Sequence, residues 1–391
     1  MLRRLVAAAT LVLATTILPG PTALAKSTTP ISDVSYHRFV TAAAPLTIAS
    51  GSASSTWTSP AFAPGFAFTE LVASWNADTT ATSLVEVDMQ ASPDGAYWTK
   101  WYVMGLWTYD DTAFHRTSVG GQGDNDGYVA IDTFVAGKVA MTSYRLQVKL
   151  TRQTSTDASP TVRALGAMTS ATPKKFSVPT PRAYTGAATL PHAVPQLSQE
   201  IHAGQFPEYD GGGEAWCSPT STAMVLGYWG QYPSAADMAY IPASYADPEV
   251  DYAARYTFDY HYNGTGNWPF NTAYAGRFGM DAFVTRLRSL DEAEAFIRSG
   301  IPLVASIAVD ANKLDGFLFK GSNGHLLVIT GITADGNVMA NDPASTSDAT
   351  VPHVYDRGQF EDAWLNHSGG IVYVIHPATG SLPVAAAQAN W

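Results

Sequence analysis

Two different patterns of apolar and polar positions divide the chain. Residues 30–170 contain short runs rich in Val, Thr and aromatic residues, such as FTELVASWNA and SYRLQVKLTRQ, separated by the turn sequences SPDG and DNDG. Short strands that follow one another at spacings of about ten residues are typical of a β-sandwich or jelly roll. The pattern therefore predicts an all-β sandwich or jelly-roll-like accessory domain over residues 30–170.

The second half, residues 191–377, mixes helical and strand patterns. SPTSTAMVLGYWG predicts a helix in which Pro219 suits the first position and Gly230 the end. In SLDEAEAFIRSG, Ser289 and Glu292 form a capping box at the start of another helix. IPLVASIAV, HLLVITGI, GNVMAND and GIVYVIH are apolar runs typical of strands, and RGQFEDAWLN favours a short helix between the last two. Helices followed by strands predict an α+β domain.

The amino-terminal sequence is typical of an export signal. It has a basic pair, Arg3 and Arg4, then an apolar stretch too short to span a bilayer comfortably, and then the small-x-small sequence Ala23-Leu24-Ala25. We therefore expect a signal peptide over residues 1–25, cleaved after Ala25. The mature protein would be secreted and extracellular, with no stable membrane insertion.

Two further segments have compositions that differ from those of the predicted domains. Residues 171–190 are rich in Pro, Ala and Thr and are predicted to be a linker. Residues 378–391 are rich in Ala and are predicted to form a flexible tail.

Charge and composition narrow the choice of partners. The formal net charge of −11 becomes −13 when the two Arg of the signal peptide are removed. Such an acidic chain is a poor partner for nucleic acid or an anionic membrane. A single Cys excludes an intrachain disulfide framework. The His residues show no zinc-binding spacing, so no metal and no cofactor is expected.

The single cysteine lies in the sequence GGGEAWCSPTSTAM. Cys217 is placed just before a predicted helix, and a helix amino terminus and a nearby imidazolium both favour the thiolate form of a cysteine. The glycines at 211–213 leave room for a substrate to approach. The alternative is an inert buried cysteine, as many free cysteines are. An exported protein gains little from an accidental reactive thiol, and we therefore favour a nucleophile.

A histidine and a carboxylate are expected to lie side by side in the same domain. His325 opens the strand HLLVITGI and Asp342 ends the next one, so two antiparallel strands joined by TADG would place them together. A base oriented by a carboxylate is the usual partner of a nucleophilic thiol. The alternatives are a structural histidine and a turn aspartate before Pro343. Asn341 is a rival for the orienting role, but consecutive strand residues face opposite ways.

These motifs together resemble a known family. VPQLSQ, WCSPTSTAMVLGYWG, GHLLVITGI and NDPAS are similar, in this order, to the C39-like cysteine peptidases, a branch of the papain-like fold, over about residues 190–377. The resemblance implies that Cys217 is the nucleophile, His325 the base and Asp342 its orienting carboxylate. It also implies a cysteine peptidase, which with the export signal predicts a secreted enzyme that hydrolyses peptide or protein substrates through a thioester acyl-enzyme. A cell-wall-associated substrate, a cell-wall amidase or acyltransferase reaction, and a non-catalytic polymer-binding protein stay open as alternatives.

The family also implies a glutamine in the oxyanion hole, shortly before the cysteine. Gln199 matches by its place in VPQLSQ, with Gln196 and Gln205 as alternatives, although 17 residues separate Gln199 from Cys217. Ser218 stands where the family usually has Gly, and a good helix N-cap such as Ser is expected to preserve the local geometry.

Other side chains are candidates for binding substrate. We predict this role for Trp216, beside the nucleophile, and for Asn267, Trp268 and Asn271 in NGTGNWPFNTAYAGRFG, where two amides could hold a peptide backbone. A helix that starts at Pro269, with Trp268 packed against it, is the alternative. In the first half, the aromatic run YWTKWYVMGLWTY suits a binding platform or a core, and strand alternation favours core for at least part of it.

Overall fold

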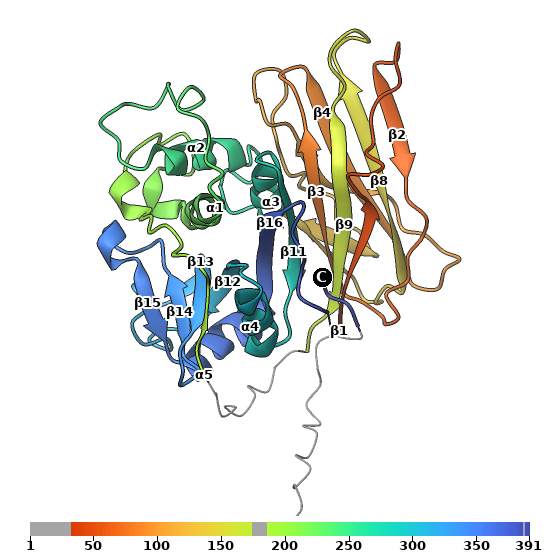
Figure 1. The fold of residues 1–391 in the computed structure, drawn as a ribbon. Coiled ribbons are helices and arrows are strands. Elements are labelled where there is room, and N and C mark those ends of the chain that lie inside the picture. Colours follow the sequence, from red (N-terminus) through yellow and green to blue (C-terminus); the bar gives the residue numbers. More distant parts are fainter. Residues whose placement is uncertain (1–32, 174–185, 386–387) are drawn as a thin grey trace, which may run out of the picture.

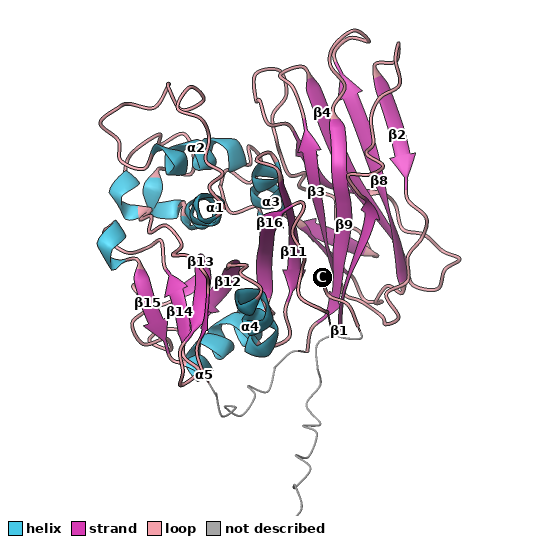
Figure 2. Cartoon of the chain, viewed as in Figure 1, coloured by secondary structure: helices cyan, strands magenta, loops and turns pink. Residues whose placement is uncertain are grey.

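The computed structural model describes residues 33–173, 186–385 and 388–391 (Figure 1). The predicted signal peptide over residues 1–25 lies outside the described residues, as do positions 174–185 of the predicted linker. Within the described part, two sheet-containing halves pack side by side, as Figure 2 shows.

Residues 33–171 form two antiparallel sheets. One has the order β1-β9-β3-β7-β6 and the other β2-β8-β4-β5. In β8, every second residue is buried, so Tyr144, Leu146, Val148 and Leu150 face the core while the intervening polar side chains face outward. The strands are β1 (Asp33–Val40), β2 (Ser54–Thr58), β3 (Glu70–Asp78), β4 (Ser83–Ser92), β5 (Tyr102–Trp107), β6 (Gly127–Ala130), β7 (Thr133–Ala136), β8 (Ser143–Arg152) and β9 (Thr161–Ala171).

The aromatic run of this half divides between core and surface. Tyr102 and Trp107 are fully buried on β5. Trp98 and Trp101 are half-buried, and the guanidinium of Arg145 stands 4.5 and 5.3 Å from their ring centres. The run therefore contributes to the core, as strand alternation favours.

The second half is built on one antiparallel sheet with the order β11-β16-β12-β13-β14-β15, to which β10 adds by pairing with β13. Its strands are β10 (Ala188–Thr189), β11 (Met280–Arg286), β12 (Leu303–Val309), β13 (Ser322–Ile332), β14 (Val338–Asn341), β15 (Pro352–Tyr355) and β16 (Ile371–Pro377). Its helices are α1 (Cys217–Tyr228), α2 (Pro248–Thr257), α3 (Trp268–Gly276), α4 (Leu290–Arg298) and α5 (Arg357–Glu361), which continues as a π-helical turn over Asp362–Asn366.

Helices cover both faces of this sheet. Val304 and Val328 point to the face covered by α1 and α3, whereas their strand neighbours Leu303 and Leu327 point to the face covered by α4. Because both faces are buried, these strands are continuously apolar in sequence, as predicted. The sheet thus has two hydrophobic layers, one of which continues into the N-terminal half.

The helix boundaries follow the sequence signals closely, with one correction. Ser289 caps α4 and accepts a hydrogen bond from the Glu292 backbone N–H, as the capping box predicts. Helix α1 begins at Cys217, two residues earlier than Pro219 suggested, so Ser218 lies inside the helix and is not its N-cap. The Ser218 hydroxyl instead lies 2.9 Å from the Tyr373 hydroxyl on β16, which ties the first turn of α1 to the sheet.

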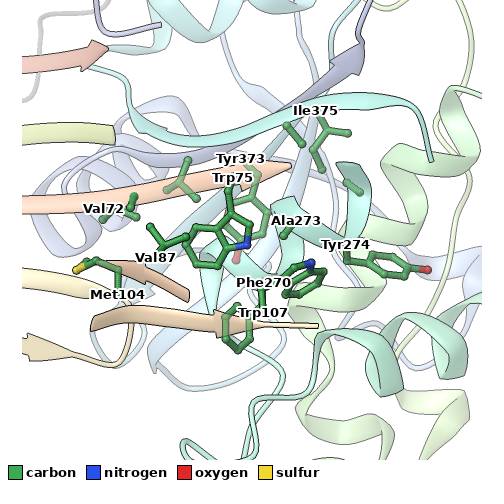
Figure 3. Close-up of a cluster of buried hydrophobic side chains, with 14 of the residues drawn as sticks. Val72, Trp75, Val87, Met104, Trp107, Phe270, Ala273, Tyr274, Tyr373 and Ile375 are labelled. Carbon is green, nitrogen blue, oxygen red and sulfur yellow. The ribbon is translucent and has the colours of Figure 1, made fainter. Parts of the chain in front are cut away.

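The two halves share a continuous hydrophobic core. Trp75 on β3 and Trp107 on β5 pack against Phe270 on α3, with ring centres 6.2 and 5.6 Å apart, as Figure 3 shows. The Asn76 side chain meets the Ala282 backbone in the manner of a strand pair, donating to its carbonyl at 2.9 Å and accepting from its N–H at 3.1 Å. The halves therefore form one packed unit.

Charged groups also stabilise the interface between the two halves, which is called the seam below. Arg38 and Asp281 form a two-pronged ion pair with both N–O distances at 2.8 Å. Arg116 is fully buried and donates to the carbonyls of Arg255 and Phe258 at the end of α2. A guanidinium suits the carboxyl end of a helix, where carbonyl groups lack partners within the helix.

The prediction of a flexible tail is corrected for the last described residues. Asn390 is buried, and its side chain donates to the Arg286 carbonyl at 2.8 Å. The Ala389 carbonyl accepts from the Tyr36 N–H on β1 at 3.1 Å, and the Trp391 ring lies 4.9 Å from that of Phe296. These bonds tie residues 388–391 to both halves, and a terminus tied in this way does not fray.

Candidate active site

Cys217 occupies the first position of α1. The first helical hydrogen bond runs from the Thr220 N–H to the Trp216 carbonyl. The Cys217 N–H therefore lies before the first residue that donates a hydrogen bond within the helix. Such N–H groups and the helix dipole favour negative charge at this end. The preceding loop reaches the helix through Gly211 and Gly212, whose φ angles of 79° and 110° lie in the region that favours glycine. The half-buried thiol therefore stands at the amino-terminal end of the helix, after a glycine-rich approach.

His325 lies on β13, opposite Ile307 of β12, and is buried. The rings of Phe317 and Phe319 stand edge-on to the imidazole, with ring centres 5.6 and 6.2 Å away. The Nε2 atom of His325 lies 2.7 Å from Oδ1 of Asp342. Because Asp342 occupies Nε2, Nδ1 is the ring nitrogen left for the side-chain hydrogen bond between His325 and Cys217.

The structure distinguishes Asn341 from Asp342, the two adjacent candidates for orienting the His325 imidazole. Asn341 pairs with Val328 on the neighbouring strand and turns its amide away, donating to the carbonyls of Val194 and Pro195. Asp342 is fully buried and faces His325. The alternation of strand residues thus separates these two side chains in the way the sequence suggested.

Two groups that the sequence did not indicate complete the surroundings of Asp342. The Tyr355 hydroxyl on β15 donates to Oδ2 at 2.7 Å, and the Ala344 N–H donates to Oδ1 at 3.0 Å. No local motif marks Tyr355, because it reaches Asp342 only after the chain has made a loop and formed a third strand. The carboxylate is consequently held by three donors, including His325.

These contacts set the charge state of the pair. Burial alone would lower the pKa of His325, but the Asp342 carboxylate and hydrogen bonds to Asp342 and Cys217 raise the pKa of the imidazole to about 10. Burial would raise the pKa of Asp342, but the imidazolium, the Tyr355 hydroxyl and the Ala344 N–H hold that pKa below its usual value. At neutral pH the histidine is therefore an imidazolium between a carboxylate and the thiol.

Gln199 lies close to this set despite its separation from Cys217 in sequence. Its N–H donates to the Pro343 carbonyl at 2.8 Å, next to Asp342, and its side-chain Nε2 donates to the Glu214 carbonyl at 2.7 Å and to the Glu200 carboxylate at 3.1 Å. The intervening loop folds back through two short 3₁₀ turns, Glu200–His202 and Gly213–Ala215.

A glycine allows this loop to close. A Cβ atom on Gly213 would stand 2.4 Å from the Gln199 carbonyl oxygen and 2.6 Å from the His202 Cβ, so only glycine fits there. Of the three glutamines considered, Gln199 lines the cleft together with Cys217. Gln205 is engaged elsewhere, because its amide nitrogen donates to the Ile201 carbonyl, and Gln196 is exposed.

The predicted substrate-binding residues separate into two groups. Trp268 is half-buried and lines the cleft. Trp216, Asn267 and Asn271 are fully buried, and the prediction that they bind substrate is corrected. The Trp216 indole donates to the Tyr209 carbonyl, Asn267 caps α3 through the Phe270 N–H, and Asn271 donates to the carbonyls of Thr265 and Asn267. Their polar atoms thus serve the local fold.

The thiol and the imidazole open into a cleft of about 920 Å³. Both halves of the chain line this cleft. Besides Cys217 and His325, the second half contributes Gln199, Tyr262, Trp268 and Phe319. The first half contributes Glu70 and, from the hairpin β6–β7, Ala130, Ile131, Asp132, Thr133 and Val135. The turn sequence DNDG and the strand pattern after it predicted β-structure here, but no motif indicated that this hairpin reaches the site.

Two negative observations concern the described residues only. Within them, no group of three or more His, Cys, Asp or Glu side chains is arranged to hold a metal ion. Nor does any helix of the described part combine the length and apolar character that crossing a membrane requires.

Comparison with known proteins gives two family matches. Residues 28–170 match the Peptidase C39 N-terminal domain, and residues 192–372 match the Peptidase_C39 like family. A search of curated proteins finds no match.

Solved structures with partial similarity include a putative C39-like peptidase from Bacillus anthracis, with 17% identity, a TM-score of 0.30, and 48% of this chain and 97% of that one covered. They also include a prointerpain A fragment from Prevotella intermedia, with 16% identity, a TM-score of 0.27, and 53% and 76% covered. A structure of infectious bursal disease virus, Gx strain, has 11% identity, a TM-score of 0.23, and 40% and 37% covered. At such TM-scores these likenesses support no conclusion about this chain.

Proposed function

The C-terminal half of the chain belongs to the C39-like peptidase family, and on this premise we propose that the chain is a cysteine peptidase of papain-like fold that hydrolyses peptide bonds. The observation that carries the proposal is the position of His325, which contacts Asp342 through Nε2 and leaves Nδ1 for Cys217 within one open cleft. A nucleophile, a base and an orienting carboxylate are the groups that acyl transfer requires.

In the first step, the Cys217 thiolate attacks the carbonyl carbon of the scissile peptide bond. The resulting oxyanion is bound by the Cys217 N–H and by Gln199 Nε2, which must exchange its bond to Glu200 for one to the oxyanion. The His325 imidazolium then gives its proton to the leaving nitrogen, the C–N bond breaks, and an amine departs. An acyl group stays on the sulfur as a thioester.

The second step returns the enzyme to its starting state. His325, now neutral, takes a proton from water, and the hydroxide attacks the thioester carbonyl. The oxyanion forms again in the same place, the C–S bond breaks, and the thiolate leaves beside the imidazolium. The product is a carboxylic acid, which loses its proton to solvent, and Asp342 orients the ring throughout by its hydrogen bond to Nε2.

The reactivity of the single thiol tests the proposal. The native protein is treated with a thiol-specific alkylating probe between pH 5 and pH 9, and the same protein unfolded in urea serves as the matched control. We expect native Cys217 to react at pH 6 at least tenfold faster than the unfolded protein, because the helix start and the imidazolium favour the thiolate. Equal rates in the two forms would contradict an activated nucleophile.

Turnover separates hydrolysis from the other acyl reactions. Wild-type protein is expected to release free amino termini from a mixed peptide substrate with water as acceptor, and Cys217→Ala is expected to release none. Transfer of the acyl group to a second amine would favour an acyltransferase. Absence of any Cys217-dependent product would favour a non-catalytic binding protein.

We also propose that the peptidase acts outside the cytoplasm. The basic pair, short apolar stretch and Ala23-Leu24-Ala25 sequence support cleavage after Ala25 and secretion. Amino-terminal sequencing of the protein released into the medium tests this, and a mature chain that begins at a residue other than Lys26 would contradict the proposed cleavage site.

A further inference from the structure

The hairpin β6–β7 brings part of the N-terminal half to the cleft that holds the nucleophile. β6 ends at Ala130 and β7 begins at Thr133, which is its ladder partner, so Ile131 and Asp132 form the turn. Both turn residues line the same cleft as Cys217 and His325. The hairpin is therefore a wall of the cleft contributed by a domain that holds none of the proposed catalytic groups.

The turn has an unusual backbone conformation at Ile131. Its φ angle is +61°, and the Asp132 N–H donates to the Ala130 carbonyl at 2.7 Å across it. A hydrogen bond between residues two apart with a positive φ at the central residue matches the γ-turn of the rare, strained type. A β-branched residue suits this conformation poorly, and backbone strain of this kind is concentrated at functional sites.

Asp132 fixes the strained turn to the second half of the chain. The carboxylate is buried and accepts from the Trp268 N–H, at the start of α3, at 2.8 Å. Its other oxygen accepts from the Thr133 hydroxyl at 2.9 Å. Because Asp132 is held on both sides, the side chain of Ile131 is held at the rim of the cleft.

Large apolar side chains from both halves of the chain are exposed along the cleft. Ile131 is 39% exposed, and two other large apolar side chains on the cleft, Tyr262 and Phe319, are 44% and 45% exposed. Tyr262 comes from the second half of the chain and lines the same cleft as Ile131 and Cys217. Covering exposed apolar surface with an apolar ligand side chain is favourable.

We propose that Ile131 is a specificity-determining residue, which together with Tyr262 forms a subsite for one apolar side chain of a peptide substrate next to the scissile bond. This inference rests on the proposed peptidase function. It gives the N-terminal half a part in choosing the substrate, and it explains why a strained β-branched residue stands at a turn position where glycine is favoured.

A set of peptides tests the subsite. The peptides share one sequence and differ at single positions around the cleavage site, where Leu, Phe, Ala, Gln or Asp is placed; cleavage is followed by mass spectrometry and kcat/KM is measured. We expect wild-type protein to prefer Leu or Phe over Ala at one position by roughly tenfold or more, as an apolar subsite does. Ile131→Asn should lower this ratio at least fivefold, and Ile131→Val should keep it.

The variants are chosen so that folding and specificity are distinguishable. Asn tolerates a positive φ better than Ile, so Ile131→Asn should melt at the same temperature as wild type or higher. Val139→Asn is the matched control, because Val139 is 60% exposed on the same half and does not line the cleft. Should Ile131→Asn fail to fold, Ile131→Gly carries the same test with the same outcomes.

Each result decides between the two proposals. An unchanged preference in an Ile131→Asn protein that still cleaves would overturn the subsite and leave the peptidase function intact. If the wild-type protein shows no Cys217-dependent cleavage of any peptide in the set, both the subsite and the peptidase function are overturned. A selective loss of Leu and Phe peptides, with Ala peptides cleaved as before, supports the subsite.

Discussion

The hydroxyl of Tyr355 donates a hydrogen bond of 2.7 Å to the oxygen of Asp342 that does not face His325. Both residues are fully buried, and the strand that carries Tyr355 pairs with the strand that ends beside Asp342. Burial, and then the Asp342 carboxylate, raise the pKa of Tyr355, so the phenol stays protonated and remains a donor. The tyrosine therefore fixes the carboxylate that fixes the imidazole, which makes it a positioning residue.

Replacing Tyr355 by Phe removes this donor and keeps the ring. We expect kcat to fall about three- to tenfold with little change in KM, because the carboxylate loses one of the bonds that orient it. The free energy of unfolding should fall by about 1–2 kcal/mol. Tyr228→Phe is the matched control, since it also deletes one hydroxyl bond, of 2.8 Å to the Gly300 carbonyl, away from the cleft. A similar loss of kcat in both variants would contradict the positioning role.

The ion pair of His325 and Asp342 predicts the pH dependence of activity. The pKa of His325 is raised to about 10, so the imidazolium form, and the stability it brings, is fully present below the ordinary histidine pKa and is lost as the pH rises through about 10. Activity should therefore decline on the alkaline side near that pH. In Asp342→Asn the main cause of the raised pKa is removed while burial still lowers it, so the alkaline limb should move down by at least one pH unit.

The measurement is a pH profile of kcat/KM from pH 5 to pH 11 for wild type and Asp342→Asn. We expect the variant to keep a low residual rate, at least tenfold below wild type, because the nucleophile is intact. Asp335→Asn makes the same charge change on the exposed turn between β13 and β14 and should leave the profile in place. An alkaline limb that stays at the wild-type pH in Asp342→Asn would mean that another group controls it.

The geometry of the candidate site was predictable from sequence where local signals marked its residues. A cysteine just before a helix, a histidine that opens a strand and an aspartate that ends the next strand each follow from motifs of a few residues, and one hairpin brings the last two together. Tyr355 and Ile131 were not predictable in this way. Each reaches the site through a tertiary contact that periodicity does not encode, one from a third strand and the other from the other half of the chain.

For the fold, too, local sequence patterns predicted some features, whereas features that depend on tertiary contacts were missed. Alternating and continuous apolar runs indicated the strands of both halves, and capping residues located α4. The seam escaped prediction because a polar residue such as Asn76 looks like an exposed strand residue in sequence, although its amide is satisfied by the backbone of Ala282. The terminal segment was predicted to be flexible from its Ala content, whereas the burial of Asn390 depends on partners far away in sequence.

A substitution at Gly213 tests whether the loop between Gln199 and Cys217 holds the Gln199 amide in place. In Gly213→Ala the new methyl group would overlap the Gln199 carbonyl and the His202 backbone, at 2.4 and 2.5 Å, so the loop must shift. We expect kcat to fall roughly tenfold to a hundredfold through displacement of the Gln199 amide, and stability to fall by about 1–3 kcal/mol. Gly358→Ala is the control, because a Cβ there would meet only the Asp356 carboxylate at an ordinary 3.4 Å. Full activity in Gly213→Ala would exclude Gln199 as an oxyanion donor fixed by this loop.

Asn76 tests whether the two halves unfold together. In Asn76→Ala the buried N–H and carbonyl of Ala282 both lose their partner, which should lower the free energy of unfolding by about 2–5 kcal/mol. Tryptophan fluorescence, to which Trp75 and Trp107 at the seam and the other eight Trp contribute, reports on urea unfolding of the whole chain, while residual peptidase activity reports on the second half. We expect the two signals to shift together to lower urea concentration, because the halves share one core.

Asn125→Ala, at an exposed position of the first half, is the control and should change stability by no more than about 0.5 kcal/mol. Separate transitions for fluorescence and activity would mean that each half is stable without the other.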